Sequence, residues 1–184
     1  ETNIILSTRL LTENYNIDKI IISFNLLLKF KPDSLLVLIY GYKDDRYYKY
    51  LDELLSKYIP SDKYLNIGFL EYSIISSCLI DSDVYISIPT SDSSPKSVYE
   101  AMACGIPSVV SNIPWTTNFI NNEKEALIVN WKNEDDIANS ILKLLDHKDL
   151  YNKISKNGSD FVKKNIDYYK NMSEMENIML SIFS

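Results

Sequence analysis

The chain has 184 residues, of which 46% are hydrophobic, so it can bury a sizeable core and is not typical of a disordered protein. Its 19 Lys and Arg residues against 25 Asp and Glu residues give a net charge of −6. An acidic domain is a poor candidate for nucleic-acid binding, so a phosphate-bearing ligand would have to be met by local groups.

Residue types that build common catalytic and metal centres are scarce. His147 is the sole histidine and lies in a polar stretch, which argues against a histidine-based triad and leaves no metal-ligand spacing. Cys78 and Cys104 have apolar helical neighbours, a context typical of buried free thiols in a reducing compartment.

The longest apolar runs fall well short of the ~20 residues needed to cross a bilayer. The amino terminus has no signal-peptide pattern and begins abruptly before a strand, from which we expect an excised domain.

Strand-like and helix-like segments alternate along the chain. Short continuous apolar runs predict buried strands, and apolar residues at helical spacing predict helices. Proline or glycine follows several predicted elements and marks where they end. Gly105 follows the helix Lys96–Cys104, at the position where helices commonly end with a left-handed backbone conformation. In chain order the predicted elements are strand Asn3–Ser7, helix Asn16–Phe30, strand Ser34–Tyr40, helix Asp45–Tyr58, strand Leu65–Leu70, helix Ser73–Ile80, strand Val84–Ile88, helix Lys96–Cys104, strand Ser108–Ser111, helix Trp115–Ile120, strand Ala126–Val129, helix Asp135–Leu145 and two helices within Leu150–Phe183.

This alternation predicts an α/β protein. Six strands without polar alternation, separated by helices, indicate a parallel sheet covered on both faces. Right-handed crossovers make it a doubly wound, Rossmann-like fold with strand order 3-2-1-4-5-6. We expect one domain over residues 1–184, in which the more polar helices at about 147–184 pack on another domain.

Two polar loops are predicted to open onto one crevice of this sheet. Ligands bind such folds at the carboxyl ends of the strands, where the strand order reverses between the first and fourth strands. The loop after the first strand carries Arg9, and the loop after the fourth carries Asp92 and leads into a helix that begins with Lys96 and Ser97. A helix amino terminus suits phosphate, because its N–H groups are unpaired and its dipole end is positive. Glu100, one turn further in, offers a carboxylate for the two hydroxyls of a ribose.

Each of these features also has a plainer explanation. Most Ser-Ser-Pro helix starts bind nothing, a lone Arg9 is more often a surface residue, and Glu100 alone would serve as a solvated helix carboxylate. The spacing by itself favours a ligand site only slightly, and the convergence of two loops strengthens that interpretation.

The segment from Asp92 to Pro107 resembles a known family. Asp92-x7-Glu100, followed by Ala-Met-Ala-Cys-Gly-Ile-Pro, is similar to the E-x7-E region of GT-B glycosyltransferases, especially family 4. Ile5–Arg9 is similar to the first strand and diphosphate-binding arginine of the carboxyl-terminal domain in that family, and Asp81–Ile86 to the strand before the motif. The resemblance covers most of the chain.

The resemblance implies the donor-binding half of a retaining, hexosyltransferase-type enzyme. Arg9 would hold the donor diphosphate and Asp92 would touch the donor sugar, so these two are the expected catalytic residues. Glu100 would bind the ribose hydroxyls. The other expected donor-binding residues are Ser93, Ser94, Lys96, Ser97 and Val98 near the phosphates, Gly68, Phe69 and Leu70 near the nucleobase, and Asn14 in the first loop.

Two positions depart from the family pattern. Asp92 stands where the motif begins with Glu, and Ser93 follows where a family variant has Gly. Asn14 stands where a second basic residue usually follows the arginine. We therefore expect weaker diphosphate binding unless Lys96 or Lys43 compensates.

The resemblance also sets expectations for partners. The donor would be a UDP- or GDP-type sugar, with no cofactor and no metal, since Asp81-Ser82-Asp83 lies at a strand entrance. A glycan or lipid-linked acceptor would need an amino-terminal domain outside this sequence, so the chain alone would bind donor weakly and transfer little. The full enzyme would act in cell-surface polysaccharide or glycoconjugate synthesis in the cytoplasm, with peripheral attachment to the inner face of the membrane as an option.

Two other functions stay open on the sequence. One is half of a sugar-nucleotide epimerase, which would need a histidine or an acidic pair acting on the sugar ring, where this chain offers Asp92 and Glu100. The other is a non-catalytic, degenerate GT-B-like interaction module, which the missing second cation favours.

Overall fold

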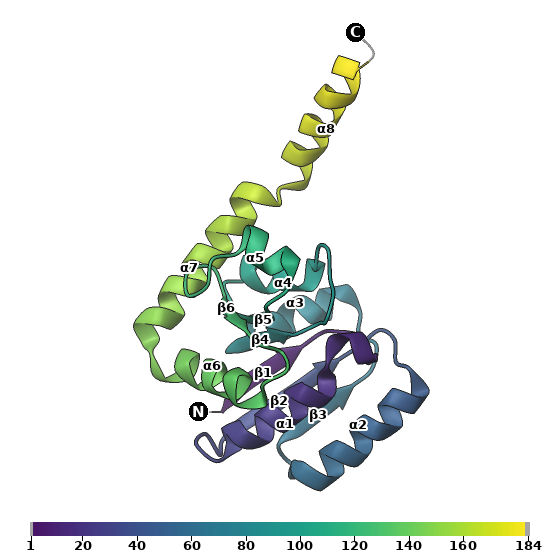
Figure 1. The fold of residues 1–184 in the computed structure, drawn as a ribbon, viewed down its shortest axis with the longest axis vertical. Helices are drawn as coiled ribbons and strands as arrows, with labels where there is room; N and C mark the ends of the chain where they lie inside the picture. The colour runs from purple at the N-terminus through teal and green to yellow at the C-terminus, as the bar shows by residue number, and fades with distance from the viewer. Residues whose placement is uncertain (1, 183–184) are drawn as a thin grey trace.

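A six-stranded parallel sheet with strand order β3-β2-β1-β4-β5-β6 forms the centre of the protein (Figure 1). The computed structural model describes residues 2–182, so the predicted helix end at Phe183 lies outside the described residues. The predicted α/β doubly wound fold and strand order are both confirmed. The strands are β1 (Asn3–Ser7), β2 (Ser34–Ile39), β3 (Tyr64–Ile67), β4 (Val84–Ser87), β5 (Ser108–Ser111) and β6 (Leu127–Val129).

Helices cover both faces of the sheet, because alternate strand side chains point to opposite sides. Ile5 of β1 belongs to a core that holds α1, α2 and α6, whereas its neighbour Leu6 belongs to a core that holds α3, α4 and α5. The helices are α1 (Ile17–Leu28), α2 (Asp45–Tyr58), α3 (Tyr72–Ile80), α4 (Lys96–Ala103), α5 (Pro114–Phe119), α6 (Glu134–Asp146), α7 (Lys148–Asn165) and α8 (Tyr168–Ile182), with the 3-10 turn η1 (Glu13–Tyr15) before α1.

The order of the strands reverses between β1 and β4. These two central strands pair in parallel, with Ile5 opposite Val84 and Leu6 opposite Tyr85. Later strands are added on the β2 side for the first half of the chain and on the β4 side for the second half. The loops after β1 and β4 therefore open at the same edge of the sheet, as predicted.

Most predicted boundaries lie within two residues of the observed ones, and two of the differences have a visible structural cause. The predicted strand Leu65–Leu70 ends at Ile67, because the last ladder bond of this edge runs from the Tyr40 N–H to the Ile67 carbonyl and β2 has by then ended. The predicted helix from Asn16 begins one residue later. Asn16 has a left-handed backbone (φ 51°), and its buried side chain donates from Nδ2 to the Ile88 carbonyl (2.7 Å).

The carboxyl end of α4 ends in a Schellman motif. The Gly105 N–H donates to the Met102 carbonyl (3.0 Å) and the Ile106 N–H to the Ala101 carbonyl (2.9 Å). Gly105 has φ +75°, a conformation that glycine adopts without the steric penalty of a Cβ atom. The expected left-handed helix end at this position is confirmed.

The last two helices are unlike the others. α7 contributes to both cores. Ile154 belongs to the core that holds Ile5, and Phe161 and Val162 pack against the core that holds Leu6. α8 extends away from the sheet (Figure 1) and buries none of its described residues. Several large apolar side chains on α8 are more than half exposed, namely Tyr168, Tyr169, Ile178, Met179, Leu180 and Ile182.

Candidate functional site

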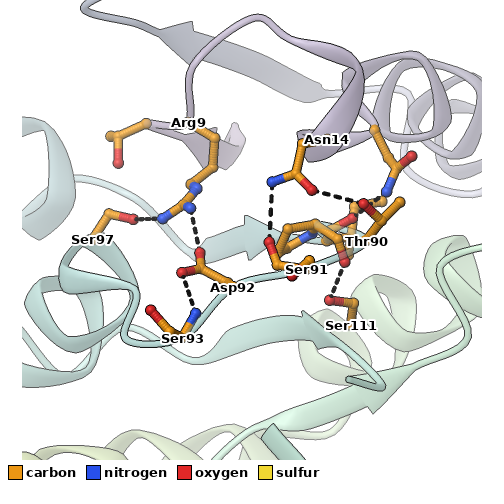
Figure 2. Close-up of polar contacts among 12 residues, drawn as sticks. Arg9, Asn14, Thr90, Ser91, Asp92, Ser93, Ser97 and Ser111 are labelled. Atoms are coloured by element: carbon orange, nitrogen blue, oxygen red, sulfur yellow. Dashed lines mark hydrogen bonds and ion pairs between the residues drawn. The ribbon is translucent and has the colours of Figure 1, made fainter. Parts of the chain in front are cut away.

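Arg9 follows the carboxyl end of β1 and contacts three residues, of which Figure 2 shows Ser97 and Asp92. Its Nη1 donates to Ser97 Oγ (2.8 Å), and its Nη2 forms an ion pair with Asp92 Oδ2 (2.5 Å). Its guanidinium carbon lies 4.2 Å from the centre of the Tyr15 ring. Its Nε is buried and has no protein partner among the described residues. A fixed guanidinium with a spare donor is a suitable group for binding an oxyanion.

Asp92 follows β4 and uses both carboxylate oxygens. Oδ2 accepts from Arg9, and Oδ1 accepts from the backbone N–H of Ser93 (2.8 Å). The Arg9 and Asp92 side chains are only 10% and 15% exposed, so their ion pair is less screened by solvent than one on the open surface. The structure thus brings together the two predicted catalytic residues.

The buried hydroxyl of Tyr85 supports Arg9 through the neighbouring Thr8 and Ser97 side chains. Tyr85 of β4 is fully buried, and its hydroxyl lies 2.9 Å from Thr8 Oγ1. Burial raises the pKa of Tyr85, while hydrogen bonds from Ser97 and Thr8 and the charge of Arg9 oppose that rise. Ser97 therefore links the buried Tyr85 hydroxyl to the Arg9 guanidinium.

Asn14 joins the two loops rather than pointing at an open site. Its amide Nδ2 donates to the Ser91 carbonyl (3.0 Å), and its Oδ1 accepts from Thr90 Oγ1 (2.7 Å). Its own backbone carbonyl accepts the Thr90 N–H (2.8 Å). From β5, Ser111 Oγ donates to the Pro89 carbonyl (2.7 Å) and fixes the same loop from its other side (Figure 2). Asn14 is therefore a loop-positioning residue in this structure, not a free ligand donor.

The amino terminus of α4 points into this loop cluster. The helix begins at Lys96 after Pro95, whose missing N–H is of no consequence in the first turn. The Val98 N–H, expected to cradle phosphate, instead donates to the Pro95 carbonyl (3.0 Å), and the Val98 side chain is buried in the core. The N–H groups of Lys96 and Ser97 come earlier in the turn, where helices lack internal acceptors. Ser93, Ser94 and Lys96 are exposed.

Glu100 lies on a pocket of about 160 Å³ between α3 and α4. Its Oε1 accepts from the Tyr72 hydroxyl (3.0 Å), and this hydrogen bond raises the pKa of Tyr72. Cys104 also lines the pocket, and burial raises the pKa of its thiol. Glu100 and Ser97 thus point to different neighbours, one toward α3 and the other toward Arg9.

The segment expected near the nucleobase follows β3 as a loop. Gly68 and Leu70 are half-buried and Phe69 is 78% exposed, and this loop precedes α3, which begins at Tyr72.

Lys43, in the loop after β2, lies with its Nζ 3.5 Å from the centre of the Tyr48 ring. This cation–π contact holds the lysine beside α2.

The described residues contain no group of three or more His, Cys, Asp or Glu side chains arranged to hold a metal ion. Asp83 of the Asp81-Ser82-Asp83 sequence lies at the entrance of β4, as predicted, and its Oδ2 accepts the Ile4 N–H (2.7 Å). Within residues 2–182, no helix is long and apolar enough to cross a membrane.

Sequence reasoning missed several polar partners of the site. Thr8, Tyr15 and Tyr85 contact or support Arg9, and Tyr72 holds Glu100. A tyrosine in the middle of an apolar strand was one available signal, because a buried phenol usually finds a hydrogen-bond partner. The Tyr15 and Tyr72 contacts left no such pattern in the sequence.

Comparisons with known proteins agree with this architecture. The model of the family "Glycosyl transferases group 1" matches residues 1–161. The UDP-Gal:α-D-GlcNAc-diphosphoundecaprenol α-1,3-galactosyltransferase of Escherichia coli is 25% identical over 166 residues, which cover 89% of this chain and 40% of that protein. An uncharacterised glycosyltransferase of Methanocaldococcus jannaschii is 22% identical, with 88% and 41% covered. The chain thus spans about two fifths of the length of these curated relatives.

Solved structures share the fold. The carboxyl-terminal domain of a Francisella tularensis group 1 glycosyl transferase superimposes with a TM-score of 0.82 at 20% identity, covering 90% of this chain and 87% of that one. Anabaena HepE, solved with UDP-glucose, has a TM-score of 0.90 at 14% identity, covering 98% and 49%. This chain belongs to the glycosyl transferases group 1 family and has the fold of its GT-B carboxyl-terminal domain.

Proposed function

We propose that the chain is the donor-binding domain of a retaining hexosyltransferase that uses a nucleoside-diphosphate sugar of UDP or GDP type. The observation that carries this proposal is the position of Arg9, between β1 and the amino terminus of α4 at the point where the strand order reverses. A cation and a helix amino terminus together suit a diphosphate. The relatives are consistent with this donor class, since one is named for UDP-Gal and another was solved with UDP-glucose.

The remaining roles follow from the elements around Arg9. The Glu100 carboxylate, on the pocket between α3 and α4, would accept the two ribose hydroxyls. The loop from Gly68 to Leu70, at the start of α3, would face the nucleobase. Asp92 would contact the sugar. Catalysis would then consist mainly of positioning the donor and stabilising the departing diphosphate through Arg9 and α4.

Titration calorimetry with UDP, GDP, UDP-glucose and a GDP-hexose tests the proposal. We expect the chain to bind either UDP or GDP. Arg9→Gln should lower the affinity for that nucleotide by at least tenfold, equivalent to about 1.4 kcal/mol. Glu100→Gln should lower the affinity for ribose-containing ligands without changing the affinity for inorganic pyrophosphate. Lys57→Gln, at the end of α2, is the matched charge control and should change neither affinity. If no nucleotide binds the wild-type chain, the donor-site proposal is wrong.

The non-catalytic module is the second candidate. It is supported by Asn14, which stands in place of a second cation and has its amide committed to Thr90 and Ser91. The absence of all nucleotide binding would favour this candidate over the donor domain.

We also propose that α7 and α8 belong to an interface with an amino-terminal domain that supplies the acceptor site. The support is the row of exposed apolar side chains on α8, a helix with no described buried residue. Exposed apolar surface of this kind is typical of interaction sites. The acceptor would be a glycan or a lipid-linked glycan, in cell-surface polysaccharide or glycoconjugate synthesis, and the full enzyme would act in the cytoplasm at the inner face of the membrane.

Removing residues 168–184 tests whether α8 is needed inside this chain. Because α8 buries nothing here, we expect the shortened chain to keep its free energy of unfolding within about 0.5 kcal/mol and its nucleotide affinity unchanged. A large loss of stability would show that α8 packs on the sheet domain itself. Transfer activity by the chain alone would contradict the need for a second domain.

A further inference from the structure

The Asp92 carboxylate makes the kinds of contact that a bound anion would make. One of its oxygens accepts from the Arg9 guanidinium and the other from a backbone N–H, that of Ser93. These are the two kinds of donor that a phosphate group uses in proteins. Asp92 is therefore an internal anion bound to Arg9, the same cation that the proposed function assigns to the donor diphosphate.

The pairing limits what Arg9 can offer to a ligand. Nη1 is engaged with Ser97 and Nη2 with Asp92, while Nε is buried and unpartnered. The Nε and Nη2 atoms lie on one edge of a guanidinium, the edge that grips an oxyanion with two parallel hydrogen bonds. Asp92 holds half of that edge. A diphosphate can take both hydrogen bonds only after the Asp92 carboxylate leaves Nη2.

From this geometry we infer that Asp92 is an exchangeable counter-ion of Arg9, released toward the sugar when the donor diphosphate takes its place. The inference rests on the proposed function. Before binding, Asp92 neutralises Arg9 and keeps it oriented with Ser97 and Tyr15. On binding, the diphosphate displaces Asp92 from Nη2, and the freed carboxylate accepts hydrogen bonds from the sugar hydroxyls. A donor that carries its sugar offers Asp92 new partners, whereas the free diphosphate offers none.

This exchange makes Asp92 a specificity-determining residue with effects of opposite sign on two ligands. Replacing it by a neutral residue removes the competitor for Arg9, so the free nucleoside diphosphate should bind more tightly. The same replacement removes an acceptor for the sugar, so the extra affinity that the sugar contributes should fall. A residue that only contacts the sugar would leave the affinity for the free diphosphate unchanged.

The test compares wild type with Asp92→Asn and Asp92→Ala by calorimetry, using inorganic pyrophosphate, UDP and UDP-glucose, or the GDP pair if the chain prefers it. We expect each variant to bind pyrophosphate and the free diphosphate about tenfold more tightly, equivalent to about 1.4 kcal/mol. We also expect the ratio of the Kd for the free diphosphate to the Kd for the sugar donor to fall toward one.

Three controls separate competition from a general change of charge. Glu13→Gln removes one negative charge from the same loop at an exposed position, and it should change these affinities far less. At physiological ionic strength, repulsion between exposed charges more than about 8 Å apart is largely screened, so a direct exchange should keep most of its effect as salt rises. Asp92→Glu keeps the charge and should not produce the tighter binding.

The outcomes are distinguishable. If wild type binds no pyrophosphate or nucleotide, the proposed donor site fails. If wild type binds and both neutral variants bind the free diphosphate equally or more weakly, with thermal unfolding showing that they are folded, the exchange is refuted while the donor site stands. An equal gain from Glu13→Gln would also refute the exchange, because the effect would then be one of net charge.

Discussion

The Tyr85 hydroxyl lies 2.9 Å from Thr8 Oγ1 and so joins β4 to the residue after β1 at the point where the strand order reverses. Tyr85 is fully buried and also has a hydrogen bond with Ser97, the acceptor of the Arg9 Nη1 proton. Through Ser97, the buried Tyr85 therefore helps to fix the orientation of the Arg9 guanidinium.

Tyr85→Phe should lower the free energy of unfolding by about 1–2 kcal/mol, because Thr8 and Ser97 lose a buried partner. It should also weaken nucleoside-diphosphate binding severalfold, since Ser97 is then free to turn away from Arg9. Urea unfolding and calorimetry measure the two effects. In a Ser97→Ala background the affinity change should vanish, and its persistence there would contradict the Ser97 link. Tyr58→Phe, near the end of α2, should alter neither quantity.

The Tyr72–Glu100 hydrogen bond should be visible as a raised pKa of Tyr72. The raised pKa means that neutral Tyr72 donates to Glu100 throughout the neutral range, and that the hydrogen bond is lost as the pH rises through that pKa. Glu100→Gln should return the pKa of Tyr72 toward its ordinary value of 10.0. Side-chain NMR of isotope-labelled tyrosine, assigned through Tyr72→Phe, measures it. An unchanged pKa in Glu100→Gln would show that Glu100 does not hold the phenol.

The Lys19–Glu134 ion pair links α1 to α6 with an Nζ–Oε1 distance of 2.6 Å. Its hydrogen bond lowers the pKa of Glu134 below the ordinary 4.5, so this contribution to stability is present above that value and is lost as the pH falls through the lowered pKa. Lys19→Met should therefore lower the free energy of unfolding by about 0.5–1 kcal/mol at neutral pH.

The same substitution should have little effect in acid, once Glu134 is protonated. Urea unfolding at neutral and acidic pH measures the difference. Lys153→Met removes an exposed lysine of α7 and serves as the control. An equal loss in acid and at neutral pH would mean that packing of the Lys19 stem, not its charge, stabilises the two helices.

Gly158 sets how closely α7 approaches α4. A Cβ atom there would lie 3.1 Å from the Glu125 carbonyl oxygen and 3.3 Å from Met102 Cγ. Alanine in a helix interior normally adds up to about 1 kcal/mol of stability relative to glycine. In Gly158→Ala we expect the tight contact to outweigh that gain, with a net loss of about 1–2 kcal/mol in thermal or urea unfolding.

Asn152→Ala, at an exposed site on the same helix, is the matched control and should be neutral or slightly stabilising. If Gly158→Ala also stabilises the chain, then α7 moves away from α4 at little cost. The close packing would in that case not be a constraint on the sequence.

Much of the fold could be predicted from local patterns. The continuous apolar runs such as Ser34–Ile39 gave β2 to within a residue, and Asp45–Tyr58 gave α2 in full, because periodicity and capping are properties of neighbouring residues. The parallel order followed from the alternation of strands and helices together with the handedness of crossovers. The differences at β3 and Asn16 came from contacts with distant parts of the chain, because β3 ends where β2 ends and the Asn16 side chain binds the Ile88 carbonyl just before α1 begins.

The sequence by itself determined the α/β architecture, the strand order and the two loops that carry Arg9 and Asp92. The tertiary structure alone decided which groups touch within the site. Arg9 meets Asp92 across 83 positions of sequence, and Tyr72 meets Glu100 across 28, contacts that depend on strand register and on how far each helix is turned on the sheet. The same packing commits Asn14 to Thr90 and leaves Arg9 Nε without a partner. Side-chain chemistry is local and readable from the sequence, whereas the choice of partner is made by the whole fold.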